Sequence, residues 1–279
     1  MIASLRAENL KSRKRIANWI LLGVLLLTLL LLGYVVTYIL LSNPPRNFQS
    51  NIPASELKRS VFPENLLPEV LSTMTSLGAA IMLIFGGLNT ASEYGWLTVQ
   101  TILVQRPGRA AVLVGKLGHL ALGSLLISLA VLGSAALTSY VLVTIDGATS
   151  AWPSTTTLVN GFGALWLELG VWTMFGMFLG VALRSTAGAI GGGITYLLVG
   201  EALISQLFRN TQGIKEVLKF LPGVNAGAIN AQFPTLFRNP NEVTQIVSAG
   251  RGTLTLIIYL VIFCVGSLLI FRRRDVTGA

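Results

Sequence analysis

Glu168 is the polar side chain that stands out most clearly in this sequence. It lies within Leu165–Gly170, near the middle of a long apolar segment. A carboxylate at that depth in a membrane is costly and normally faces a bundle interior or a water-filled cavity, so it is a functional candidate. The alternative is a protonated or hydrogen-bonded packing residue at a helix or subunit interface. Glu201 lies nearer the end of the next apolar segment, where its side chain can reach water, and a structural role is favoured there.

The other residue types that often act in catalysis or metal binding occur singly in this sequence or without the motifs that such chemistry requires. His119 is the only histidine and Cys264 the only cysteine. A lone histidine without further ligands at suitable spacing is a poor metal site, and one cysteine makes no internal disulfide. The phosphate-binding motif Gly-x-x-x-x-Gly-Lys-Ser/Thr is absent, since Gly115-Lys116 is followed by Leu117. We therefore expect no catalytic residue, no metal and no cofactor in this chain, which is not expected to be an enzyme.

Six long apolar segments must position these residues. Apolar residues make up 53% of the chain and charged residues 11%, against roughly 25% charged in soluble domains. The segments are continuous rather than alternating, which excludes barrel strands, and each is long enough to cross a membrane as a helix. We predict an all-α membrane protein with six transmembrane helices in one domain, 1–279. The segments lie at about 19–42, 70–90, 110–145, 158–183, 187–207 and 252–271.

The net charge of +9 is explained by topology. Twelve of the 20 basic residues precede the first apolar segment, lie between the second and third or the fourth and fifth, or follow the sixth. Such enrichment in short loops marks the cytoplasmic side, so both termini are predicted to be cytoplasmic. The acids in these basic segments are Glu8, Glu93 and Asp275. Attraction to anionic lipid accounts for the remaining charge, and no nucleic-acid partner is expected.

Three segments outside the apolar runs have patterns of their own. Residues 1–18 mix basic and apolar side chains, which predicts an amphipathic interfacial helix, with a solvated basic tail as the alternative. Residues 91–105 predict a short amphipathic helix, either a docking element or a lipid-surface helix. Residues 208–250 form a large outer segment in which 214–221 has the spacing of an amphipathic helix.

Prolines and glycines add two further expectations. Five prolines within residues 43–69 are expected to confine that first outer loop to short helical pieces such as Ala54–Ser60. Gly176 and Gly180 stand four residues apart, a spacing that lets helix backbones approach closely within the bundle.

The residues around the predicted 91–105 helix form a pattern. They are Ser92-Glu93-Tyr94-Gly95-Trp96-Leu97-Thr98, then Leu103, Arg106-Pro107, Arg109 and Gly115-Lys116-Leu117. This pattern resembles the first cytoplasmic loop of type-two ATP-binding-cassette (ABC) permeases. The Tyr-Gly-Trp version and the start Glu8-Asn-Leu-Lys11 resemble bacterial members related to antibiotic and bacteriocin immunity exporters.

The resemblance implies a permease subunit of an ABC exporter in a bacterial inner membrane. Its partners would be two ATPase subunits, which bind ATP and Mg²⁺, a second permease copy or homologue, and membrane lipid. Its cargo would be an amphipathic or hydrophobic compound such as a drug, a peptide or a lipid-like molecule. By the same resemblance 91–105 is a coupling helix that docks the ATPase through Glu93, Tyr94, Gly95, Trp96, Val99, Leu103 and Arg106. Two other functions remain open: an ion-coupled transporter or channel using Glu168, or a membrane protein that confers toxin immunity without transport.

Overall fold

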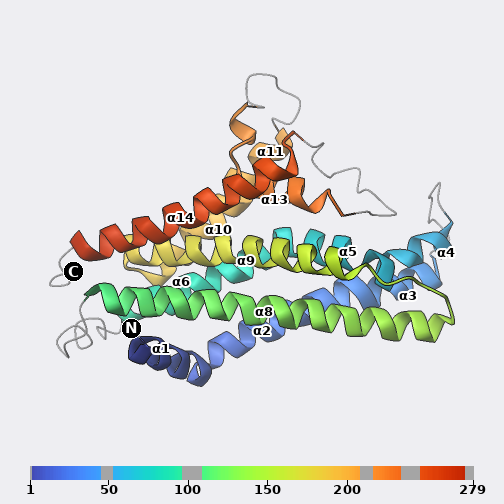
Figure 1. The fold of residues 1–279 in the computed structure, drawn as a ribbon, viewed down its shortest axis with the longest axis horizontal. Helices are drawn as coiled ribbons and strands as arrows, with labels where there is room; N and C mark the ends of the chain where they lie inside the picture. The colour runs from blue at the N-terminus through green and yellow to red at the C-terminus, as the bar shows by residue number, and fades with distance from the viewer. Residues whose placement is uncertain (1, 45–52, 96–108, 208–215, 234–245, 274–279) are drawn as a thin grey trace.

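The computed structural model describes residues 2–44, 53–95, 109–207, 216–233 and 246–273, which form helices and contain no strand (Figure 1). Within these ranges five helices are long and apolar enough to cross a membrane. They are Ile16–Ser42, Pro63–Tyr94, Ala111–Asp146, Thr155–Leu183 and Ala249–Arg273. The all-α prediction is confirmed for the described residues, and the five helices indicate a multi-pass membrane protein.

The N-terminal segment contains two helices that meet at Arg15. Helix α1 (Ile2–Lys14) is separated from α2 (Ile16–Thr28) by the extended backbone of Arg15, with φ −85° and ψ 108°. The first long helix then continues through the π-helix η1 (Leu29–Val36) to α3 (Thr37–Ser42). The helix predicted over 1–18 therefore ends at Lys14, and its last residues belong to the first long helix.

The second long helix begins earlier and ends later than its apolar pattern predicts. The short pieces α4 (Ala54–Leu57) and η2 (Lys58–Val61) agree with the expected helix at 54–60. The long run follows as η3 (Pro63–Asn65), α5 (Leu66–Thr73), the π-helix η4 (Met74–Gly78) and α6 (Ala79–Gly95).

The prediction that prolines restrict residues 63–69 to a loop with short helical pieces is therefore wrong, because these residues begin the second long helix. Pro63 opens η3 and Pro68 lies in the first turn of α5, positions where the missing N–H is tolerated. The carboxylate of Glu69 consequently belongs to the long helix. At the other end, residues 91–95 of the predicted coupling helix continue α6, and residues 96–105 lie outside the described ranges.

The remaining helices run back and forth along the bundle. Helix α8 (Arg109–Asp146) is followed by α9 (Thr155–Leu183), which ends at Arg184 in the left-handed conformation with φ 52°. After this predicted tight turn come α10 (Thr186–Thr195), the π-helix η5 (Tyr196–Leu203) and α11 (Ile204–Leu207). These three form one helical run over the fifth apolar segment, but the run is not among the five helices above. The six-span count stays a prediction.

Helices α6 and α9 form the closest pair in the bundle. A Cβ atom added to Gly86 would lie 2.0 Å from the carbonyl oxygen of Thr173, and one added to Gly176 would lie 2.0 Å from that of Leu83. Only glycine permits such an approach of two backbones. Gly180 is also close to α6, since its added Cβ would lie 3.1 Å from Thr90 Cβ. Tight packing by this glycine series, expected from its spacing, is confirmed.

Part of the predicted outer segment 208–250 packs within the bundle. Helix α13 (Pro222–Asn230) contacts α5, η4, α9 and η5 as well as α14 (Ala249–Arg273), and six of its nine residues are buried. Of the amphipathic helix predicted over 214–221, residues 216–218 are helical and 214–215 lie outside the described ranges. Placement of this segment on the outer face stays a prediction. Figure 1 shows that α1, the end of α6, the start of α8 and the end of α14 share one end of the bundle.

Candidate functional site

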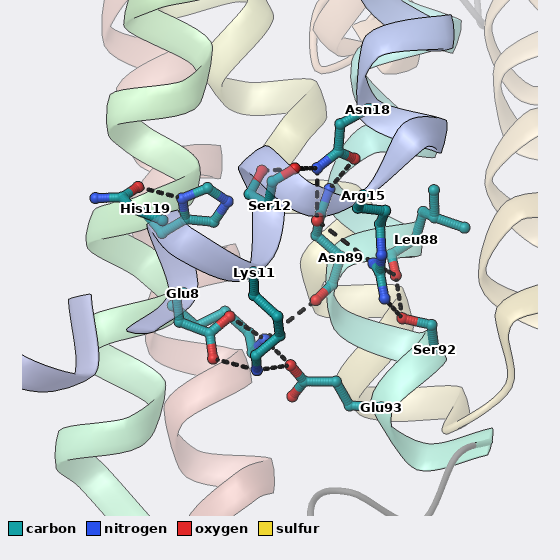
Figure 2. A network of polar contacts seen from close by, with 12 residues as sticks. Glu8, Lys11, Ser12, Arg15, Asn18, Leu88, Asn89, Ser92, Glu93 and His119 are labelled. Carbon is teal, nitrogen blue, oxygen red and sulfur yellow. Dashed lines mark hydrogen bonds and ion pairs between the residues drawn. The ribbon is translucent and has the colours of Figure 1, made fainter. Parts of the chain in front are cut away.

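A buried polar network, here called the α1 network, fastens α1 to the neighbouring ends of α6 and α8 (Figure 2). Its members are Glu8, Lys11, Arg15, Asn18, Asn89, Ser92, Glu93 and Lys116. Gly115 allows α1 to lie against α8, since a Cβ at this position would be 2.3 Å from Ser4 Oγ and 3.1 Å from the backbone nitrogen of Leu5. The close crossing brings the next residue, Lys116, beneath α1.

Two lysines and two glutamates form the charged centre of the α1 network. Lys116 Nζ lies 3.0 Å from Glu8 Oε2 and 3.0 Å from Glu93 Oε1, and it also donates to the carbonyl oxygen of Asn89 at 3.1 Å. Lys11 Nζ contacts the same two carboxylates at 2.9 and 2.6 Å. The Lys11 side chain is 42% exposed, whereas that of Lys116 is 5% exposed. These two lysines and two glutamates offset one another in charge, and among the four side chains Lys11 is the exposed one in the described structure.

Both groups of α1 in this centre are held in their charged forms. Burial alone would raise the pKa of Glu8, but the adjacent Lys116 and Lys11 outweigh it and bring this pKa below its ordinary value. Burial alone would lower the pKa of Lys11, but its bonds to Glu93 and Glu8 outweigh it and raise this pKa. The ion pairs on α1 are therefore complete at neutral pH.

A second set of bonds joins the Arg15 turn to α6. The Arg15 guanidinium donates to the carbonyl oxygen of Leu88 at 3.0 Å and to Ser92 Oγ at 2.7 Å. The Asn18 and Asn89 amides exchange hydrogen bonds of 3.2 and 2.9 Å. These contacts, drawn in Figure 2, fix the angle between α1 and α2 through α6.

The predicted site residues divide between described and undescribed parts of the chain. Glu93 lies inside the α1 network with 4% of its surface exposed. The Tyr94 ring centroid lies 5.9 Å from the Arg184 guanidinium carbon, and Gly95 ends α6. The predicted docking residues Trp96, Val99, Leu103 and Arg106 lie outside the described ranges. Within those ranges no three His, Cys, Asp or Glu side chains form a group that could hold a metal.

The partners of Glu93 were not predicted from the sequence. Composition did single out Glu8 and Glu93 as acids in otherwise basic segments, and this was the available signal for a charge-balanced pair. The contribution of Asn18, Asn89 and Ser92 had no comparable signal.

The lone histidine, His119, lies beside α1, where its Nδ1 is 2.6 Å from Asn9 Oδ1. The network offers no nucleophile with an adjacent base, and what it does structurally is join three helix ends.

The carboxylates Glu168 and Glu201 lie outside the α1 network. Glu168 is 2% exposed, which confirms that it faces protein. Its carboxyl faces Thr75 and Asn230, yet neither oxygen makes a hydrogen bond of ordinary geometry to a described residue. Glu201 is also buried, so its expected access to water is wrong. Its carboxylate accepts hydrogen bonds from the backbone of Gly223, at 2.9 Å, and from the Tyr196 hydroxyl, at 3.2 Å, a structural role at the start of α13.

Comparison with known proteins identifies the family but supplies no activity. A family model described as "Protein of unknown function (DUF2705)" matches residues 39–277. No curated protein sequence gives a significant match. The matched part contains α6 and α8, with Glu93 and Lys116, whereas α1 precedes it. Since the match covers most of the sequence, the chain belongs to the DUF2705 family of proteins of unknown function.

Proposed function

We propose that this chain is the permease subunit of an ABC exporter in a bacterial inner membrane, with both termini in the cytoplasm. Two separate ATPase subunits bind its cytoplasmic side and hydrolyse ATP with Mg²⁺. A second copy or a homologous chain completes the pathway, through which an amphipathic or hydrophobic compound leaves the cell. The support from sequence is the resemblance of residues 91–117 to the ATPase-docking loop of type-two ABC permeases.

The α1 network is the observation that carries the proposal. Helix α6 enters segment 96–108 and α8 leaves it, and Glu93 and Lys116 tie both helix ends to α1. A displacement applied to that segment by a docked protein would reach three helices at once. Such an arrangement suits the conversion of ATPase closure into movement of membrane helices.

The α1 network is sensitive to the loss of one member. Removing one partner of a buried ion pair leaves an uncompensated charge and costs about 3–5 kcal/mol. A substitution at Glu93 should therefore disturb the joint between α1, α6 and α8.

Reconstitution with an ABC ATPase tests the proposal. The chain should co-purify with such an ATPase from its native host in mild detergent, and the purified chain alone should hydrolyse no ATP. Glu93→Gln should lower substrate-stimulated hydrolysis by the complex. Glu64→Gln is the matched control, because Glu64 pairs with Arg59 in the 53–65 region and lies outside the α1 network. Purification of the chain without any ATPase would contradict this function. Equal rates of ATP hydrolysis in complexes that contain the Glu93→Gln and Glu64→Gln variants would contradict it as well.

A second function is favoured by one observation, the buried carboxyl of Glu168, whose oxygens make no hydrogen bond of ordinary geometry to a described residue. An ion-coupled transporter needs such a group inside the membrane. Proteoliposomes containing only this chain separate the two functions. Uptake driven by an ion gradient without ATPase, and abolished by Glu168→Gln, would favour the ion-coupled transporter over the ABC permease.

A further inference from the structure

Three polar side chains from different elements meet inside the bundle at Glu168. Glu168 comes from α9, Thr75 from η4 and Asn230 from the end of α13. Asn230 Nδ2 donates to Thr75 Oγ1 at 2.8 Å, and Thr75 Oγ1 donates to the carbonyl oxygen of Leu71 at 2.8 Å. The Glu168 carboxyl faces both side chains. We call Glu168, Thr75 and Asn230 the α9–α13 cluster.

The α9–α13 cluster has more acceptors than donors. Both carboxyl oxygens of Glu168 and Oδ1 of Asn230 are buried without a hydrogen-bond partner among the described residues. Each unsatisfied buried acceptor costs about 1–3 kcal/mol, and a charged one costs more. A species that supplies positive charge or a donor hydrogen at this place would remove most of that cost.

Side chains of the described residues do not supply that charge. Helices α5, α6, η4, α8, α10, α13 and α14 pack against α9, and no charged or titratable group on them acts electrostatically on the Glu168 carboxyl. Glu69 of α5 lies beside Gly33 of η1 instead. Glu201 of η5 is engaged with Gly223 and Tyr196.

We propose that the α9–α13 cluster is a proton-binding site with Glu168 as the group that binds the proton. A hydronium ion from solvent gives its proton to a Glu168 carboxylate oxygen, an O–H bond forms, and a water molecule is released. The neutral acid then has a donor hydrogen for a neighbouring acceptor oxygen. A proton suits the cluster better than a metal cation, which requires about six or more oxygen ligands for Ca²⁺ or Mg²⁺.

The proton has a route of exchange along α13. Thr75 and Asn230 are only partly buried, whereas Glu168 is 2% exposed. Gln232, two residues after Asn230, is exposed, and Gly227, one turn before it, has open space around it. Asn230 therefore joins the buried carboxyl to a helix end that is partly exposed in the described structure.

Protonation at Glu168 is coupled to the position of α13. A buried carboxylate without a cation is unfavourable, so loss of the proton requires water to enter or α13 to move. Thr75 belongs to a π-helical segment, a form that interrupts regular helices and is frequent at functional sites. The neutral form holds α13 against η4 and α9, and the ionised form loosens it.

Infrared spectroscopy of the full chain in lipid nanodiscs tests this site. The carbonyl stretch of a protonated carboxylic acid is followed from about pH 4 to about pH 9, a range that includes shifted carboxyl groups in proteins. Glu168→Gln should remove one band that titrates in this range. Glu201→Gln is the matched control, because Glu201 is also a buried carboxylate but has two hydrogen-bond donors. That variant should keep the titrating band.

A second variant covers the case in which Glu168→Gln does not fold. Asn230→Ala leaves the carboxyl in place and should shift both the frequency and the midpoint of the titrating band. A Glu168 band that does not change with pH would identify a permanently neutral packing residue and overturn the proposal. A band that responds to sodium or potassium rather than to pH would assign the site to a cation instead. No ATPase is present in this experiment, so its failure leaves the proposed permease function untouched.

Discussion

Replacing Lys116 with methionine should strongly destabilise the attachment of α1. Methionine keeps the length of the lysine stem and removes its charge. In the wild-type chain Lys116 Nζ lies 3.0 Å from each of two buried carboxylates. The variant removes the buried cation that Glu8 and Glu93 share, and leaves them with Lys11 and with the charge of Arg15, which acts on both carboxylates.

The expected loss follows from these distances. At an effective dielectric constant of about 20, each 3.0 Å contact corresponds to a gross attraction of about 5–6 kcal/mol. Desolvation of the three charges offsets most of this, and breaking a buried pair costs about 3–5 kcal/mol in measured cases. We expect Lys116→Met to lower the free energy of unfolding by that amount.

Lys11→Met is the matched control, because Lys11 contacts the same two carboxylates from a position that is 42% exposed. Solvent screens the exposed Lys11 ammonium, so its loss should cost less than that of Lys116, even though both carboxylates are buried. Unfolding of each purified variant, titrated with denaturant in mixed micelles, measures the difference. A cysteine pair at Asn9 and His119, in a Cys264→Ala background, reports by cross-linking whether α1 itself has detached.

Equal losses for Lys116→Met and Lys11→Met would refute the argument that burial makes Lys116 the stronger partner. A loss below about 1 kcal/mol for Lys116→Met, the value of a surface pair, would refute it as well. Adding Glu8→Gln to Lys116→Met should recover part of the loss, because one uncompensated charge is then removed. A further loss in that double variant would show that charge imbalance is not the cause.

Three further predictions concern packing and pH. Gly176→Ala should cost about 1–3 kcal/mol or more in thermal unfolding, because its Cβ would meet the Leu83 carbonyl oxygen at 2.0 Å, while Gly133→Ala, with open space, should be neutral. Gly115→Val should abolish the α1 cross-link described above while the long helices remain, as circular dichroism would show; full cross-linking would contradict the close crossing. The pKa of Glu8 is lowered in the folded chain, so its contribution is present above its unfolded value, 4.5, and is lost as the pH falls below that value. The free energy of unfolding, measured with denaturant as above, should therefore fall as the pH is lowered through this range, and an unchanged value would contradict the ion-pair account.

Much of the architecture was predictable because it depends on local composition. Continuous apolar runs long enough to cross a membrane predict helices, and the burial of Glu168 in protein follows from the cost of a carboxylate facing lipid. The close pair at Gly176 was predictable from glycine spacing. The start of the second long helix was not predictable from the sequence. Pro63 and Pro68 indicate an interrupted helix unless they lie in the first turn of a helix, and only the structure shows that they do.

The partners of the charged residues were decided by tertiary structure. Glu8 and Lys116 are separated by 108 positions in sequence, and they meet because α1 crosses α8 at Gly115. The insertion of α13, which brings Asn230 to Thr75, likewise depends on the space left between long helices. The sequence by itself determined that the chain forms long apolar helices and which side chains are too polar to face lipid, because both follow from transfer free energies of individual residues. Which polar groups pair with each other depends on where helices cross, and packing across the whole bundle sets those crossings.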